Sequence, residues 1–138
     1  MSHPIRFADA QLSVRDLLRT LLSGRLGSAE GVTVSTRLPG TKSDDAPALP
    51  FIAVRVDANA RTYRLLGLAT VRVAVWHRDE GLGVDLAALC EGLLLSASSP
   101  EVRSIGPVNS PLATTDPDTG DPLAFFTVVA RLRPSLIL

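Results

Sequence analysis

The stretch LATVRVAVWHRDEG, residues 68–81, alternates between apolar and mixed positions, which predicts a β-strand with two different faces. One face would carry small and branched apolar side chains: Ala69, Val71, Val73 and Val75. The other face would carry a mixture of arginine, tryptophan and small residues: Thr70, Arg72, Ala74, Trp76 and Arg78. The first face is typical of a core-facing surface, and the second raises the question of what covers it.

Similar alternation predicts strands at 32–38, 51–58, 62–77 and 123–133, with a weaker, proline-interrupted strand at 101–115. In the last of the four regular strands, every second residue on one face is apolar: Phe126, Val128, Ala130 and Leu132. We therefore expect most of the chain's β-structure to have one side buried in a common core.

Helical spacing predicts two helices, at about 10–24 and 80–97. Asp9 is a candidate N-cap of the first helix. In the second helix we expect one buried leucine stripe, made of Leu82, Leu86, Leu89 and Leu93. Cys90 lies four residues from both Leu86 and Leu94, which predicts a small, buried core residue rather than a nucleophile.

Three segments have the composition of connections. Residues 39–50 contain three prolines, a glycine and two aspartates, and a loop of this length tends to be functional or mobile. Residues 59–61 would form a tight connection in an antiparallel hairpin, and residues 116–122 would form a turn. The order α-β-β-β-α-β-β predicts an α+β fold, with a mostly antiparallel sheet of four to five strands packed against two helices. The length of 138 residues suits a single domain spanning 1–138.

Charge and composition narrow the classes of function. The 14 basic and 14 acidic residues balance, whereas a free-standing nucleic-acid-binding domain usually has a basic excess. No apolar run is long enough for a membrane span, and the single cysteine permits no internal disulfide. The sequence therefore predicts a soluble protein, made in a cytoplasm, that recognises no specific nucleic-acid sequence.

Candidate catalytic and metal sites are few. His3 and His77 are the only histidines, and two histidines with one cysteine do not make a closed structural zinc site. Asp79 is near enough to orient His77, but no nucleophile accompanies them, so we expect an exposed histidine at a strand end. The segment DPDTGD at 116–121 departs from a calcium-binding loop after its third position and favours a plain turn. We expect no catalytic residues, no cofactor and no metal, and hence no enzyme.

The mixed outer positions of the strands have the composition of a protein interface, in which arginine and aromatic residues are enriched. The candidate residues for contacts between subunits are Arg64, Arg72, Trp76, Arg78, Phe125 and Arg131. The apolar C-terminal stretch PSLIL would either dock on the chain's own second face or on a neighbouring chain, and the sequence leaves both open.

The layout resembles that of the tail terminator (tail completion) proteins of long-tailed bacteriophages. The resemblance rests on a short N-terminal helix, LPFIAVRVDA entering a hairpin, ATVRVAVW leading into GVDLAALCEGLLL, and a closing GPV…DPDTGDPLAFFTVVARLRP. It spans roughly residues 8–135 as an order of elements. The alternatives are another head–tail connector or neck protein, and a small non-catalytic ligand-binding α+β domain.

The resemblance implies a virion protein that forms a ring, usually a hexamer, at the end of the tail tube. Such a ring ends tube polymerisation and offers a head–tail joining surface, with DNA free to pass through it. The implied partners are the major tail tube protein and head–tail connector proteins, first met in the host cytoplasm during assembly. The candidate residues for loops that contact the tube are Thr41, Lys42, Asp44, Asp45, Asp116 and Asp118.

Overall fold

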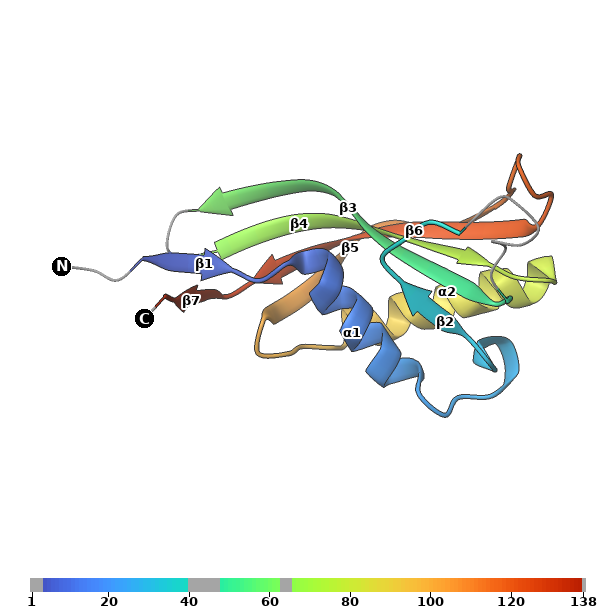
Figure 1. Cartoon of the computed structure of the whole chain (residues 1–138), viewed down its shortest axis with the longest axis horizontal. Helices are drawn as coiled ribbons and strands as arrows, with labels where there is room; N and C mark the ends of the chain where they lie inside the picture. The colour runs from blue at the N-terminus through green and yellow to red at the C-terminus, as the bar shows by residue number, and fades with distance from the viewer. Residues whose placement is uncertain (1–3, 40–47, 63–65, 138) are drawn as a thin grey trace.

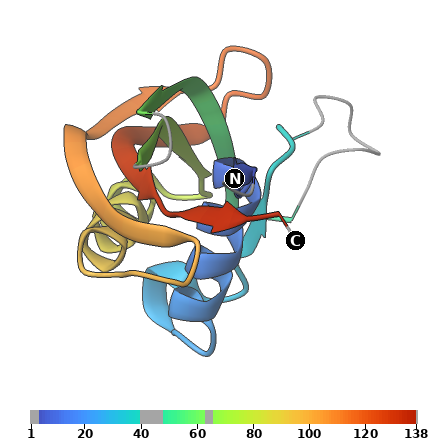
Figure 2. The same ribbon diagram turned by 90° about the vertical axis from the view of Figure 1, so that its left-hand side faces the viewer.

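The computed structural model describes residues 4–39, 48–62 and 66–137, and these residues form an α+β fold in which two helices lie on one side of a sheet (Figure 1). The helices are α1, Ala10–Leu22, and α2, Glu80–Leu95. The main sheet of the described residues has five strands in the order β2-β3-β4-β6-β5. Figure 2 shows this sheet curving over the two helices. The predicted fold class is confirmed.

The central strand of the main sheet is β4, Leu66–Trp76, which runs antiparallel to both of its neighbours. These neighbours are β3, Phe51–Thr62, and β6, Pro122–Leu132. The short strand β2, Thr33–Ser35, adds to β3 in parallel and supplies the one parallel pair among the described strands. The outermost strand on the other side is β5, Val102–Thr115.

The core lies between the helices and the inner side of the main sheet. The inner positions of β4 and β6 that alternation predicted are fully buried, as Val73 and Phe126 illustrate. From α1, Val14 and Leu18 pack against them with no exposed surface. The apolar faces of the strands and of the helices therefore form one buried cluster. Burial of this apolar surface is the main source of folding free energy.

The buried stripe of α2 differs from the predicted leucine stripe. Leu86 is buried as expected, but Leu82 is 42% exposed, and the stripe instead runs through smaller residues. Its members are Gly83, Leu86, Ala87, Cys90 and Leu94. Small side chains on the buried side allow the helix backbone to pack closely against the sheet. Leu82 lies on the side of the helix and stays partly exposed.

Both helices begin at an aspartate cap. Asp9 Oδ1 accepts a hydrogen bond from the Leu12 N–H at 3.1 Å, which confirms the predicted cap of α1. Asp79 Oδ1 accepts from the Leu82 N–H at 2.9 Å and caps α2 in the same way. Each aspartate satisfies a backbone donor that has no partner within its helix, and its negative charge is favourable at the helix N-terminus.

The hairpin of β3 and β4 is longer than predicted. Strand β3 continues through residues 59–61, which were expected to form the connection, and pairs as far as Thr62 with Leu66. A register shift between Val56 and Ala58 leaves Asp57 as an extra residue, a β-bulge that resets the alternation and lets the ladder continue. The connection itself therefore falls at 63–65, outside the described residues.

The two ends of the chain pair with each other, which the sequence did not predict. Strand β1, Ile5–Phe7, runs antiparallel to β7, Pro134–Leu136, and the two form a small separate sheet. The Ile137 N–H donates to the Pro4 carbonyl at 2.8 Å beyond the last pair. Figure 1 shows this terminal ribbon, β1 with β7, at the end of the molecule opposite the β5–β6 turn.

Strand β5 keeps the proline-interrupted character that its sequence predicted. Its pairing with β6 shifts register three times, and two of these shifts fall within the segment from Pro107 to Leu112. Among the described strands, none pairs with the other side of β5. Proline and bulges at such an edge oppose pairing with another chain.

Candidate subunit interface on the outer face of the sheet

We call the side of the main sheet that points away from α1 and α2 the outer face. Its positions on β4 and β6 alternate with the buried core positions, and most are only partly buried. Aliphatic, aromatic and arginine side chains are mixed there, as the sequence predicted. The structure shows which of these side chains the chain itself covers.

Trp76 is covered by its own chain. Its side chain is only 6% exposed, and it belongs to a small second cluster with Phe51 and Ala53. The Phe51 and Trp76 rings meet edge to face with 6.1 Å between centroids. The indole N–H donates to Asp116 Oδ2 at 2.7 Å. The apolar ring of Trp76 is therefore packed, and its N–H is hydrogen-bonded, within its own chain.

Asp116 is a structural part of the β5–β6 turn rather than an exposed loop residue. The residue is buried, and its Oδ1 accepts a hydrogen bond from the Asp118 N–H at 2.8 Å. The bond from Trp76, joined by hydrogen bonds from the turn, lowers the pKa of Asp116 despite the opposing effect of burial. Any contact that this turn makes with a partner would therefore use Asp118, which is exposed, in preference to Asp116.

Arg72 is an exposed basic residue at the centre of the outer face. It lies directly opposite Arg55 on β3, a like-charged pair that is unfavourable by itself. Asp57 at the bulge relieves this repulsion, with its Oδ2 at 3.1 Å from Arg72 Nη2. Arg55 turns away and donates from Nη1 to the Thr36 carbonyl at 2.9 Å. The Arg72 side chain stays 55% exposed and free to contact a partner.

Phe125 and Arg131 lie on the outer face of β6 and are partly buried. Phe125 pairs with Ala74 on one side and with Leu112 on the other. Arg131 reaches across to β5, where Nη1 donates to Ser104 Oγ at 3.4 Å. Both predicted residues are therefore on the predicted face, at its two ends.

Each remaining candidate either lies beyond the outer-face strands or falls outside the described residues. Arg78 is exposed but lies beyond the last residue of β4, so the strand parity that grouped it with Arg72 no longer applies. Five candidates lie outside the described residues: Thr41, Lys42, Asp44, Asp45 and Arg64. The segment 39–50, predicted to be a loop, also falls mostly outside them.

An apolar depression of about 280 Å³ lies on the outer face, near the end of β4. We call it the outer-face depression, and it is lined by Leu38, Arg72, Ala74, Trp76, Leu123 and Phe125. Among the described residues that line it, Arg72 is the only charged one. Alternation in the sequence placed Arg72, Trp76 and Phe125 on the outer face. Ala74 and Leu123 occupy outer-face positions of β4 and β6 in the same alternation. Leu38 was predicted as the last residue of a strand at 32–38, but β2 ends at Ser35 and Leu38 follows it outside any strand.

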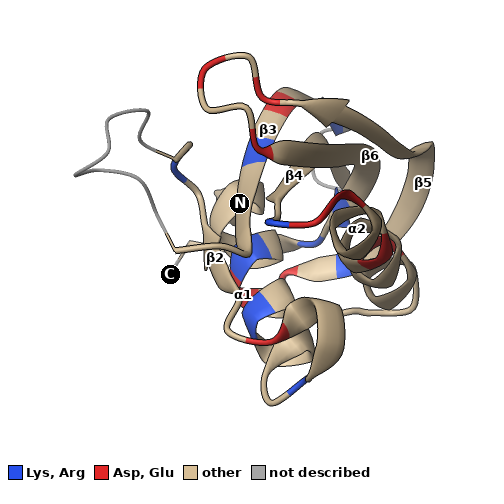
Figure 3. Cartoon of the chain, turned by 90° about the vertical axis from the view of Figure 1, so that its right-hand side faces the viewer, with Lys and Arg blue, Asp and Glu red and all other residues tan. Residues whose placement is uncertain are grey.

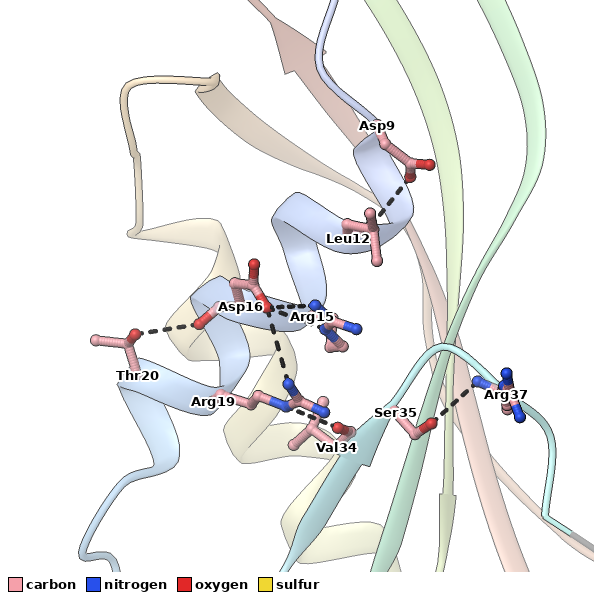
Figure 4. Close-up of polar contacts among 9 residues, drawn as sticks. All are labelled: Asp9, Leu12, Arg15, Asp16, Arg19, Thr20, Val34, Ser35 and Arg37. Carbon is pink, nitrogen blue, oxygen red and sulfur yellow. Dashed lines mark hydrogen bonds and ion pairs between the residues drawn. The ribbon is translucent and has the colours of Figure 1, made fainter.

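A second group of polar contacts holds α1 against β2 (Figure 4). Arg19 Nε donates to the Val34 carbonyl at 2.9 Å, which occupies an acceptor on the outer edge of β2. Asp16 Oδ1 lies 2.9 Å from Arg15 Nη2 and 4.0 Å from Arg19 Nη1. These exposed ion pairs contribute little stability, so the backbone contact from Arg19 is the informative one.

The described residues offer little chemistry for catalysis or for metal binding. His77 is buried, which corrects the expectation of an exposed histidine: Nε2 lies 3.1 Å from the Ser28 carbonyl, and Nδ1 accepts from the Asp79 N–H at 3.3 Å. Burial raises the pKa of Cys90 to about 12, so its thiol stays protonated. Within the described residues no three His, Cys, Asp or Glu side chains gather as metal ligands.

The charged residues in the described part of the chain are of mixed sign. Figure 3 shows basic and acidic residues interspersed, with acidic ones on the β5–β6 turn. No described helix combines the length and apolar character needed to cross a membrane.

Comparison with known proteins gives a likeness in fold to a virion chain. Neither a protein-family model nor a curated protein sequence matches the chain significantly. Among solved structures, a chain of the structure described as the virion of a native gene transfer agent (GTA) particle matches with a TM-score of 0.60. The match covers 91% of this chain and 98% of that chain, at 12% sequence identity. The protein therefore has the fold of a chain that is found in a gene transfer agent virion.

Proposed function

We propose that this protein is a structural component of a phage-like virion and forms a ring that caps the end of the tail tube. The observation that carries the proposal is the likeness in fold to a chain of the gene transfer agent virion, which spans nearly the whole of both chains. The order of elements that resembles tail terminator proteins supports the more specific role. A structural role also agrees with the few catalytic groups among the described residues.

Ring formation requires a heterologous contact, in which two different surfaces of one chain meet on neighbouring copies. The outer-face depression offers an apolar surface with one arginine at its border, the composition that favours protein interfaces. The balanced charge of the chain sets up no large repulsive field between copies. The proposed ring is a hexamer, and Arg72, Phe125 and Arg131 contribute to its contacts.

Capping the tube requires that one side of the ring match the last ring of tail tube subunits. The exposed turn at Asp118 is one candidate for that contact. The other candidates keep only their sequence-based support and lie outside the described residues: Thr41, Lys42, Asp44 and Asp45. The opposite side of the ring would face the head–tail connector proteins, so bound rings would end polymerisation and leave a joining surface.

The assembly state tests this proposal. We expect the purified protein at high concentration, or in the presence of tail tubes, to form a closed oligomer whose mass light scattering measures after size exclusion. Leu38, 64% exposed at the border of the depression, offers a variant that spares the core. Leu38→Asp should weaken assembly, whereas Leu26→Asp, at a leucine that is 77% exposed and lies just after α1, should not.

The result also separates the main proposal from its alternative. A protein that assembles but binds only to the head side of the neck, and not to tube ends, would be another connector. A protein that stays monomeric and binds neither would contradict both virion roles.

A further inference from the structure

The terminal ribbon of β1 and β7 has one apolar face. Ile5 pairs with Leu136 and Phe7 pairs with Pro134, and residues directly opposite each other on antiparallel strands point to the same side. Arg6 and Ser135 form the other, polar side. A two-stranded ribbon is marginally stable in water unless such an apolar face is covered.

Described residues of the main sheet contact the Phe7 end of that face, and those around the Leu136 end leave it exposed. Phe7 packs at the end of the β3–β4 hairpin, with the Arg61 guanidinium 4.7 Å from its ring centroid. At Gly67 the fit is so close that an added Cβ would lie 2.9 Å from the Phe7 ring. Leu136, at the other end of the ribbon, is 54% exposed, and the following Ile137 is 44% exposed. An apolar projection is therefore left at the tip of the molecule.

The outer-face depression lies at the opposite end of the same strands. In the ladder between β4 and β6, Gly67 pairs with Leu132 next to the ribbon, and Trp76 pairs with Leu123 at the depression. Nine residues of strand separate these ends by roughly 30 Å. Figure 1 shows the ribbon at one end of β4 and β6, with the opposite strand ends far from it. The ribbon in this structure cannot fill the depression of its own chain.

We propose that the Leu136 end of the terminal ribbon docks into the outer-face depression of a second copy of this chain. The proposal deepens the proposed ring and rests on it. A projecting apolar tip and an apolar depression at opposite ends of one molecule form two complementary halves of a heterologous contact. Each copy gives its tip to one neighbour and its depression to the other, so the contact repeats around the ring.

This contact also accounts for three features of the surfaces. Two of the more exposed large apolar residues, Leu38 and Leu136, become buried against each other. The apolar lining of the depression, of which Ala74, Leu123 and Phe125 are part, meets an aliphatic partner. Arg72 lies at the border of the depression, so its partly exposed guanidinium stays in solvent or faces acidic groups of the neighbour.

Disulfide trapping tests the contact directly. Cys90 is the only native cysteine and is buried, so the natural chain contributes no competing thiol at the surface. The double variant Leu38→Cys/Leu136→Cys should give, on mild oxidation at high concentration, a reducible ladder of dimers, trimers and larger covalent species. The matched control Leu26→Cys/Leu136→Cys keeps one cysteine and moves the other to an exposed leucine outside the depression.

The ladder has a defined pattern if the contact is heterologous. A mixture of the two single variants, Leu38→Cys and Leu136→Cys, should stop at dimers, because each chain then has only one reactive end. The proposal is overturned if the double variant cross-links no more than the control. It is equally overturned if the disulfide forms within one chain, which would run as a monomer of altered mobility.

The disulfide-trapping result can be distinguished from the result of the test for ring formation. If the unmodified protein forms closed rings and the double variant gives no ladder, the docking contact is wrong and the ring remains. If the ladder forms but light scattering shows only open chains that bind no tube end, the contact stands and the capping role fails.

Discussion

At the scale of single residues, the hydrogen bond from Trp76 to Asp116 fixes the β5–β6 turn to the end of β4. We predict that Asp116→Asn lowers the free energy of unfolding by about 1.5–3 kcal/mol at pH 7, the usual range for a hydrogen bond to a charged group. Urea unfolding measures the loss. Asp118→Asn, which changes an exposed carboxylate two residues away, is the control and should have little effect.

The same pair predicts a dependence on pH. Because the Trp76 bond lowers the pKa of Asp116 in the folded protein, the charged carboxylate stabilises the fold at pH values above the unfolded pKa of about 4. That stabilisation is lost as the pH falls through the lowered folded-state pKa. The difference in stability between the natural protein and Asp116→Asn should therefore shrink below about pH 4. A difference that grows on acidification would contradict this assignment.

Cys90 gives a second prediction at this scale. Its side chain is fully buried, and burial raises the pKa of its thiol to about 12. We expect a bulky thiol reagent to modify Cys90 only as fast as the protein unfolds, and rapidly in denaturant. Fast labelling of the native protein, with no loss of secondary structure by circular dichroism, would show that the helix α2 is not packed as described.

Residue-level predictions from the sequence succeeded where the signal is local. Spacing within one helix identified Cys90 as buried, and the position of Asp9 identified a cap. The sequence missed the burial of His77, whose partner Ser28 is 49 residues away, and the bond of Trp76 to a residue 40 positions along the chain. Alternation says which face a side chain is on, but not which distant segment covers it.

At the scale of elements, two glycines allow opposite predictions from the same substitution. Gly92 is inside α2, and a Cβ there would meet nothing within 4 Å. Gly92→Ala should therefore raise the free energy of unfolding by roughly 0.5–1 kcal/mol, because alanine has less backbone freedom to lose in a helix. Thermal or urea unfolding measures this gain, and a loss would mean that α2 packs more tightly at this point.

Gly67→Ala should instead loosen the terminal ribbon. The new Cβ would lie 2.9 Å from the Phe7 ring, so the ring must move away from the β3–β4 hairpin. Overpacking of this kind costs typically about 1–3 kcal/mol. Hydrogen exchange should show faster exchange in β1 and β7, including the Ile137 N–H, with the core strands unchanged. Unchanged protection of the ribbon would contradict its proposed support by Phe7.

The elements whose buried faces the sequence predicted best are those with a sustained period. The faces of β4 and β6 and both helices were readable because each repeats its pattern over ten residues or more. The terminal strands have three residues each, too few for a period to be visible. The bulge at Asp57 breaks the alternation of β3, so its extension to Thr62 was not predicted.

At the scale of the whole molecule, the order of elements was enough to predict the α+β fold and its mostly antiparallel sheet. The interface was less accessible to sequence reasoning, because a mixed face has the same composition whether the chain or a partner covers it. The structure divides that face: Trp76 and Phe51 are covered within the chain, and the described residues leave a depression beside them.

The central claim is that the protein forms a ring at one end of a tail tube, and its location on the tube tests this most directly. Tail tubes assembled from the major tail tube protein of the same virus would be incubated with labelled protein and imaged by electron microscopy. The account predicts label at one end of each tube, as a closed ring, and no further growth of labelled ends when tube subunits are added. Label along the tube wall, or labelled ends that continue to grow, would contradict it.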